Sequence, residues 1–210
     1  MIALSYTIIA RIKCIWGEYI MPSSFAKKLA AVGQKQYDLY HFDSENDPPL
    51  ANQIKRYWQG IGQSFPGVGT PWSAVFVSWC VKQAGATAAE FPFSPAHSQF
   101  VYKCIQNATN QTGVFRAFDI ASYAPQLGDI IQNNRDGNSF DYQYAKTHKS
   151  YVSHSAIVIE VGVDSNGSYA TTIGGNESDS IRMKLVRLNA NGLIKQRPTG
   201  SYISVIQDLK

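Results

Sequence analysis

Residues 71–85 read PWSAVFVSWCVKQAG, and this stretch decides the fold. Placed on a helix, its apolar side chains leave no wide polar face, which is typical of a helix that lies inside a domain. Pro71 cannot continue an upstream helix, and Gly85 suits the residue just past a helix end. The sequence therefore predicts a central buried helix with the rest of the chain packed around it.

Ser73 falls in the first turn of this predicted helix. Free backbone N–H groups and the helix dipole favour negative charge there. A serine in that place is either an N-cap or a nucleophile, and capping is the commoner role. The choice depends on the residues that the rest of the chain brings to it.

Composition limits the class of protein. The chain has 210 residues, 44% of them hydrophobic, which suits one globular domain with an N-terminal extension. The net charge of +4 comes from scattered lysines and arginines, so we expect no nucleic-acid partner; an anionic polymer such as a cell wall fits equally well. Three cysteines, Cys14, Cys80 and Cys104, indicate neither a disulfide framework nor a cysteine metal site.

We assign residues 1–45 to the extension and 46–210 to the main domain. An apolar run near the start precedes Arg11 and Lys13, which is the wrong order for a signal peptide, and it is too short to span a membrane. We therefore expect no transmembrane segment. A helix is predicted over 25–32, and our hypothesis is that Met21 is the native start, with 1–20 not native.

The order of elements predicts an α+β domain. Helices are expected over 50–61, 71–85 and 94–105, the last capped by Ser94. Five strands are expected after them, over 127–132, 155–162, 169–173, 180–188 and 202–206, with a long polar insertion over 133–149 and a hairpin turn over 164–167. This pattern predicts an antiparallel sheet of about five strands with the central helix packed on one face.

Four polar residues stand at the ends of predicted elements. Ser73 begins the central helix, Asp129 and His154 begin two strands, and Asn176 ends a third. One helix start and three neighbouring strand ends can converge on a point, where a scaffold presents its chemistry.

The motifs around these residues resemble a known clan. They are Pro71-Trp72-Ser73-Ala74 and, one residue later, Phe-Val-Ser-Trp at 76–79, then Gly-Asp-Ile at 128–130, Ser-His at 153–154 and Ile-Gly-Gly-Asn at 173–176. Their order and spacing resemble the NlpC and CHAP clan of papain-like amidases and peptidases. Within that clan, residues 91–98 and 173–180 look most like the bacterial family called domain of unknown function 2272.

This resemblance implies a papain-like, NlpC-type fold and a catalytic set. The clan's nucleophile falls at Ser73, its base at His154 and its polar orienting group at or near Asn176. This chain has serine where the clan has cysteine, and a serine hydroxyl needs a well-aligned base because it does not ionise readily. Trp72 and His97 are expected to contact substrate.

Three readings of the site stay open. In the first, Ser73 is a nucleophile and no cofactor is needed. In the second, Ser73 is a cap, and His97, Asp129 and His154 hold a zinc ion with one open coordination position. In the third, the site is catalytically silent and the protein only binds the cell wall or a partner.

The implied function is hydrolysis of amide bonds in bacterial cell-wall peptides. Peptidoglycan or its stem peptides would be the partner of either an enzyme or a silent binding module. Without a clear signal peptide, such a protein is expected to be made in the bacterial cytoplasm and to act in the periplasm or on the wall. An antibacterial effector or lysin fits this reading, and an effector would need an immunity protein.

Overall fold

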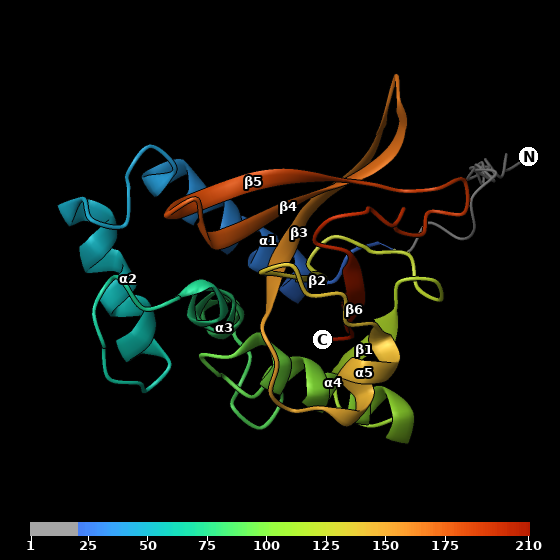
Figure 1. Cartoon of the computed structure of the whole chain (residues 1–210), viewed down its shortest axis with the longest axis horizontal. Coiled ribbons are helices and arrows are strands. Elements are labelled where there is room, and N and C mark those ends of the chain that lie inside the picture. The colour runs from blue at the N-terminus through green and yellow to red at the C-terminus, as the bar shows by residue number, and fades with distance from the viewer. Residues whose placement is uncertain (1–20) are drawn as a thin grey trace, which may run out of the picture.

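The computed structural model describes residues 21–210, which form a mixed α+β domain (Figure 1). This confirms the α+β class. The helices are α1 (Ser24–Tyr40), α2 (Pro48–Gly60), α3 (Ser73–Ala84), α4 (His97–Asn110) and α5 (Tyr142–Thr147). The strands are β1 (Phe115–Asp119), β2 (Ile130–Asn134), β3 (Ser153–Asp164), β4 (Gly167–Glu177), β5 (Ser180–Arg187) and β6 (Tyr202–Asp208).

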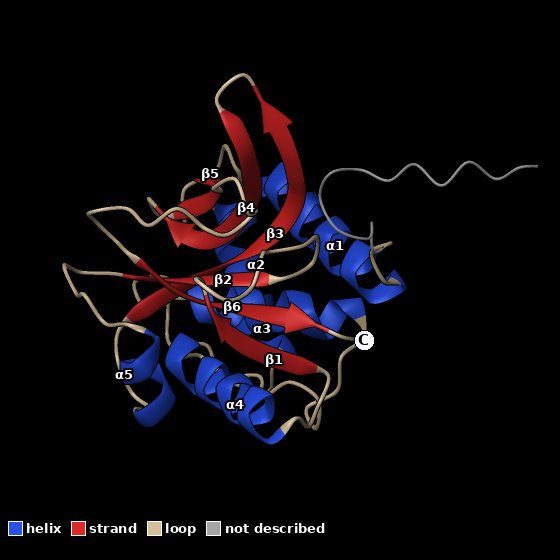
Figure 2. Cartoon of the chain, turned by 90° about the vertical axis from the view of Figure 1, so that its right-hand side faces the viewer, coloured by secondary structure: helices blue, strands red, loops and turns tan. Residues whose placement is uncertain are grey.

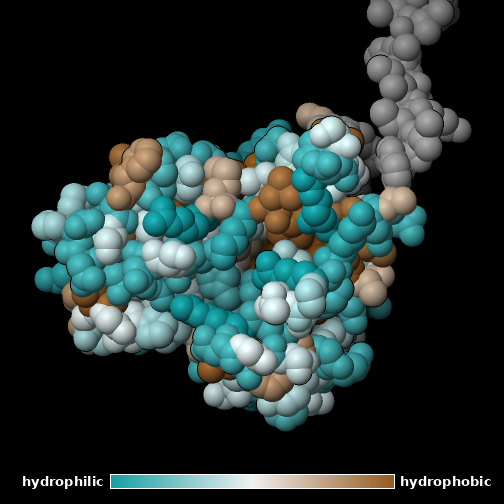
Figure 3. All heavy atoms as spheres, turned by 45° about the horizontal axis from the view of Figure 1, so that its top comes forward, coloured by the Kyte–Doolittle hydropathy of each residue, from teal (hydrophilic) through white to brown (hydrophobic). Residues whose placement is uncertain are grey.

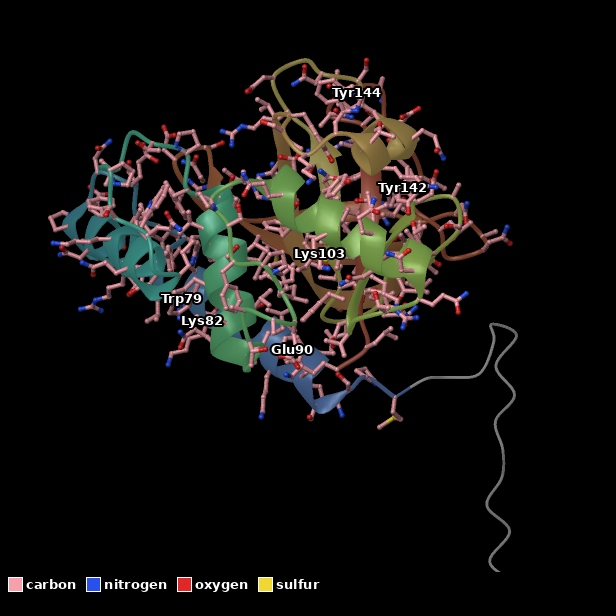
Figure 4. All side chains as sticks on the ribbon, turned by 90° about the horizontal axis from the view of Figure 1, so that it is seen from below. Trp79, Lys82, Glu90, Lys103, Tyr142 and Tyr144 are labelled. Atoms are coloured by element: carbon pink, nitrogen blue, oxygen red, sulfur yellow. The ribbon has the colours of Figure 1, made fainter. Side chains whose placement is uncertain are left out.

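The central helix α3 forms where the apolar run predicts it. Nine of its side chains are buried, and it ends at Gly85, whose φ of 109° is the left-handed conformation that favours glycine. On the side of α3 that faces α2, Lys82 donates to the carbonyl of Gly60 at 2.6 Å, and Trp79 packs against Tyr57 with ring centroids 5.0 Å apart (Figure 4). These contacts fix α3 between α2 and the sheet.

All strand pairs are antiparallel, in the order β1-β6-β2-β3-β4-β5. The predicted hairpin turn is confirmed, because Asp164 pairs with Gly167. The expectation of about five strands misses β1, which pairs with β6 at one edge. Strands β2 to β5 lie in chain order, but β6 returns to lie between β1 and β2. This pairing joins distant segments and is not revealed by local patterns.

The helices cover one face of the sheet (Figure 2). Neighbouring strand residues alternate between two apolar clusters: Ile130 and Ile157 join the cluster that includes the helices, whereas Ile131 and Val158 join a second cluster with no helical residue. This alternation follows from the two-residue period of a strand. The surface in Figure 3 is mostly hydrophilic. No helix within residues 21–210 is long and apolar enough to cross a membrane.

Helix α1 corrects the predicted domain boundary at residue 45. It is longer than the expected 25–32, and Ser23 caps it by accepting from the amide of Ala26 at 2.9 Å. Its residues Phe25 and Leu29 belong to the main core, so α1 is part of the domain rather than an extension. Gly128 lies so close that an added Cβ would sit 2.6 Å from the α1 backbone. The hypothesis about residues 1–20 lies outside the described residues.

Helix α4 starts later than predicted. Its first residue is His97, and Ser94 does not cap it. Instead the Ser94 hydroxyl accepts from the amide of Ala96 at 3.0 Å, in the turn that precedes the helix. The insertion over 133–149 is also not wholly irregular, because it contains α5, capped by Asp141. The later start matters because it puts His97, like Ser73, at the first position of a helix.

Candidate active site

Ser73 does not cap α3. The N-cap residue is Trp72, which makes no side-chain capping bond, and Ser73 is the first helical residue. Its Oγ lies 2.7 Å from Nε2 of His97, which is a hydrogen bond between two buried side chains. The capping interpretation is therefore wrong, and the hydroxyl is directed at an imidazole instead.

His97 is buried, and its surroundings disfavour the protonated form of the ring. Burial removes water from the ring, and nearby His154 and Arg135 add positive charge, so the pKa of His97 lies well below its usual value. The ring is therefore neutral near pH 7, and in the tautomer that carries its hydrogen on Nδ1 it can accept a proton at Nε2 from Ser73. Its Nδ1 is buried without a hydrogen-bond partner in the described part of the chain. His97, expected to contact substrate or metal, is the direct partner of Ser73.

His154 stands next to this pair rather than in it. Its ring centroid lies 5.4 Å from that of His97, and its Nε2 lies 2.7 Å from Oε1 of Glu177. Glu177 also forms an ion pair with Lys184. Burial alone would raise the pKa of Glu177, but its hydrogen bonds and charge interactions with His154 and Lys184 lower it overall. Glu177 is therefore an ionised partner of the His154 imidazole.

Two glycines of the Ile-Gly-Gly-Asn motif allow this close packing. A Cβ at Gly175 would lie 2.6 Å from the Trp72 ring and 2.7 Å from Phe76, so a side chain would push β4 away from α3. A Cβ at Gly174 would lie 2.8 Å from Nε2 of His154 and would collide with Glu177. The motif thus lets β4 approach both the helix and the histidine.

Asn176, predicted to orient the imidazole, forms its side-chain hydrogen bond with Glu45 rather than with His154. It adopts a left-handed conformation with φ of 55°, and its side-chain amide donates to Oε2 of Glu45 at 2.9 Å. The neighbouring Glu177 takes the expected place beside His154. Trp72, predicted to contact substrate, is fully buried and offers no surface; its indole N–H also donates to Glu45, at 2.9 Å.

Asp129 lies apart from both histidines. Its carboxylate accepts from the backbone amides of Gln126 at 2.7 Å and Asp208 at 3.1 Å, and burial raises its pKa to about 7. Asp129 pairs with Val158, four residues along β3 from His154, which is about 13 Å of strand. The structure therefore does not assemble His97, Asp129 and His154. Residues 21–210 contain no other group of three His, Cys, Asp or Glu side chains suited to a metal.

Sequence reasoning missed Glu177, Lys184 and Glu45. Glu177 directly follows Asn176, so an acid at the end of a strand after Gly-Gly was the available signal. Nothing local to Glu45 indicates that it contacts a residue 131 positions away. What the site contains is a neutral imidazole bonded to a hydroxyl, with a second imidazole–carboxylate pair beside it. This set can remove a proton from Ser73 and stabilise the positive charge that results.

The comparisons with known proteins give one family. The family described as "Uncharacterized protein conserved in bacteria (DUF2272)" matches residues 41–206, which include every site residue named above. The search of curated proteins found no match, and neither did the search of solved structures.

Proposed function

The chain belongs to the bacterial family DUF2272, and we propose that it hydrolyses amide bonds in cell-wall peptides with Ser73 as nucleophile. The observation that carries this proposal is the 2.7 Å hydrogen bond between Oγ of Ser73 and Nε2 of His97 at the start of a buried helix. A serine bonded to a neutral imidazole is the arrangement that nucleophilic catalysis requires.

We further propose that the fold is papain-like, of the NlpC type. In support, the nucleophile begins a helix packed on an antiparallel sheet, while His154 and Glu177 lie on the adjacent strands β3 and β4. This chain departs from the clan in having serine for cysteine and a second histidine, His97, between the nucleophile and the strand histidine.

The proposed reaction has two steps. Oγ of Ser73 attacks the amide carbon and passes its proton to Nε2 of His97; the C–N bond then breaks, and the imidazolium returns the proton to the leaving amine. Water next attacks the acyl-serine and gives up a proton to the same imidazole. The acyl C–O bond then breaks, the acid leaves, and the imidazolium returns the proton to Oγ of Ser73. The free backbone N–H groups in the first turn of α3 are available to stabilise the developing oxyanion. The Glu177 carboxylate, bonded to the His154 ring beside His97, offsets the positive charge that develops on His97 during the reaction.

One observation favours a second candidate. Ser73 is only 3% exposed, so a substrate carbonyl has little access to its hydroxyl. The alternative is a wall-binding or partner-binding module in which the Ser73–His97 bond is structural. In either case we propose action in the periplasm or on the wall; an antibacterial effector of this kind would require an immunity protein.

The test is incubation with purified peptidoglycan and analysis of released muropeptides by mass spectrometry. We expect wild type to release them, and Ser73→Ala to lose about 10³-fold or more of the rate. His154→Ala should lose most activity and also lower the free energy of unfolding by about 3 kcal/mol, because the buried Glu177 carboxylate loses its imidazole partner. Ser78→Ala is the matched control, since Ser78 lies on the same helix but bonds to Ser94.

Two results would count against the proposal. Folded wild-type protein that releases nothing, yet sediments with peptidoglycan, would favour the binding module. Activity of Ser73→Ala equal to that of Ser78→Ala would remove Ser73 from the chemistry.

A further inference from the structure

The loop between α1 and α2 is bonded to the turn between β4 and β5. The amide of Glu45 donates to the carbonyl of Asp179 at 2.6 Å, and the Ser180 hydroxyl donates to the carbonyl of Asp43 at 2.6 Å. Nearby, Arg182 donates to the carbonyl of His41 at 2.6 Å. Three hydrogen bonds therefore fix this loop, and with it Glu45, against the end of the sheet.

One oxygen of Glu45 joins the two halves of the candidate site. Oε2 accepts from Nε1 of Trp72 at 2.9 Å and from Nδ2 of Asn176 at 2.9 Å. Trp72 directly precedes Ser73, and Asn176 directly precedes Glu177, the partner of His154. The carboxylate thus bridges the residue before the nucleophile and the residue before the acid.

We propose that Glu45 is a positioning residue that sets the alignment of the Ser73–His97 pair relative to the His154–Glu177 pair. It touches none of the four side chains, so it acts through Trp72 and Asn176. This inference rests on the proposed function. The other constraint between α3 and β4 at this point is apolar packing of Gly175 against Trp72 and Phe76.

The physical reason is directionality. Apolar surfaces slide over one another at small cost, whereas a hydrogen bond weakens steeply as its angle and length change. Two bonds to one oxygen therefore fix the separation of the α3 start and the β4 end more tightly than packing does. A displacement of about 1 Å in an active site costs as much as about 100-fold in rate.

The experiment measures covalent labelling of Ser73 by a fluorophosphonate probe, followed by intact mass, and the imidazole nitrogen shifts of His97 and His154 by NMR. Glu45→Ala removes both bonds; we expect labelling at least tenfold slower and shifts of both imidazoles. Glu45→Gln retains an oxygen acceptor at the same place, so it should label within about threefold of wild type.

Glu160→Ala is the matched control. Glu160 also accepts from two side chains, the hydroxyls of Tyr169 at 3.0 Å and Thr171 at 3.3 Å, but these lie along the β3–β4 hairpin. It should leave labelling and both imidazoles unchanged. If Glu45→Ala does not fold, Asn176→Gly breaks one of the two bonds and tolerates the left-handed backbone; it should also slow labelling.

The outcomes separate the two proposals. If wild type is labelled, and Glu45→Ala is labelled equally fast with unchanged imidazole shifts, the positioning role is overturned. If wild type is not labelled, the nucleophile proposal fails, and the imidazole shifts alone decide about Glu45: movement in Glu45→Ala but not in Glu45→Gln supports it, and no movement refutes it.

Discussion

Oγ of Ser73 lies 2.7 Å from Nε2 of His97, on a different helix and 24 residues along the chain. Each residue is the first of its helix, so the starts of α3 and α4 meet at this bond. The strand histidine His154 approaches from the sheet with its ring centroid 5.4 Å from that of His97. The site therefore holds two histidines with different tasks, one on the hydroxyl and one on a carboxylate.

His97 should stay neutral at mildly acidic pH. Its folded pKa is lowered, so the unfolded chain binds a proton below about pH 6.5 when the folded protein does not. The stability that the neutral ring contributes is thus present above pH 6.5 and is lost as the pH falls. We expect the imidazole nitrogen shifts of His97, assigned by their loss in His97→Gln, to remain those of a neutral ring at pH 6. A midpoint at or above 6.5 would contradict this.

Ser73→Cys should create a reactive thiol. A thiol at a helix start beside an imidazole has a lowered pKa, so alkylation by iodoacetamide near pH 7 should be about tenfold faster than that of a free thiol. Cys80 and Cys104 are internal controls, because burial raises the pKa of both thiols. Cys14→Ser serves as the background. Alkylation no faster than that of glutathione, or unchanged by a second substitution His97→Ala, would show that the imidazole does not activate this position.

The serine-nucleophile and zinc hypotheses make opposite predictions for chelation and for substitution of Asp129. Since the Asp129 carboxylate accepts from two backbone amides, we expect a chelator to leave activity unchanged and Asp129→Asn to retain it. Zinc near one equivalent by elemental analysis of protein purified without a His-tag, with activity lost on chelation and restored by zinc, would instead support a metal-dependent amidase.

Asp129→Asn should also change the pH dependence of stability. The raised pKa of Asp129, about 7, means that the folded state binds its proton more tightly than the unfolded chain. This contribution is complete below pH 3.8 and is lost as the pH rises through 7. In wild type the loss of this contribution lowers the free energy of unfolding by up to about 1.4 kcal/mol per pH unit between pH 3.8 and about 7. Denaturant titrations at several pH values should show a flatter profile for Asp129→Asn; an identical slope would mean that Asp129 is already ionised at acidic pH.

Gly174→Ala should lower activity by disrupting the hydrogen bond between His154 and Glu177. The added methyl group would lie 2.8 Å from Nε2 of His154 and collide with Glu177, breaking the hydrogen bond between them. We expect peptidoglycan hydrolysis to fall about 10–100-fold, the range typical for loss of a supporting partner. The matched control is Gly33→Ala in α1, where the nearest atoms lie 3.8 Å away; it should retain full activity and gain up to about 1 kcal/mol of helix stability. Equal activities would mean that the His154–Glu177 bond is dispensable.

The sequence by itself determined the central helix, the order of helices before strands, and the hairpin at 164–167. These features depend on apolar period, proline, and glycine in left-handed turns, all of which act between near neighbours. It also singled out Ser73 and His154, because polar residues at the ends of apolar elements are conspicuous, and it named His97 as a substrate contact or zinc ligand. Two of these three form a hydrogen bond, and the ring of the third lies beside them, tilted by 60° to that of His97.

Only the tertiary structure decided which partners these residues have. The bonds of Glu45 to Trp72 and Asn176 join positions 27 and 131 residues apart, and His154 meets Glu177 across 23. A strand pattern shows which residues share a face, but not which residue at the next strand's end comes within 3 Å. For that reason the sequence predicted Asn176 rather than Glu177 as the orienting group and predicted that Trp72, which is buried, contacts substrate. It also placed Asp129 with His154, although the residue that pairs with Asp129 lies four residues along β3 from that histidine.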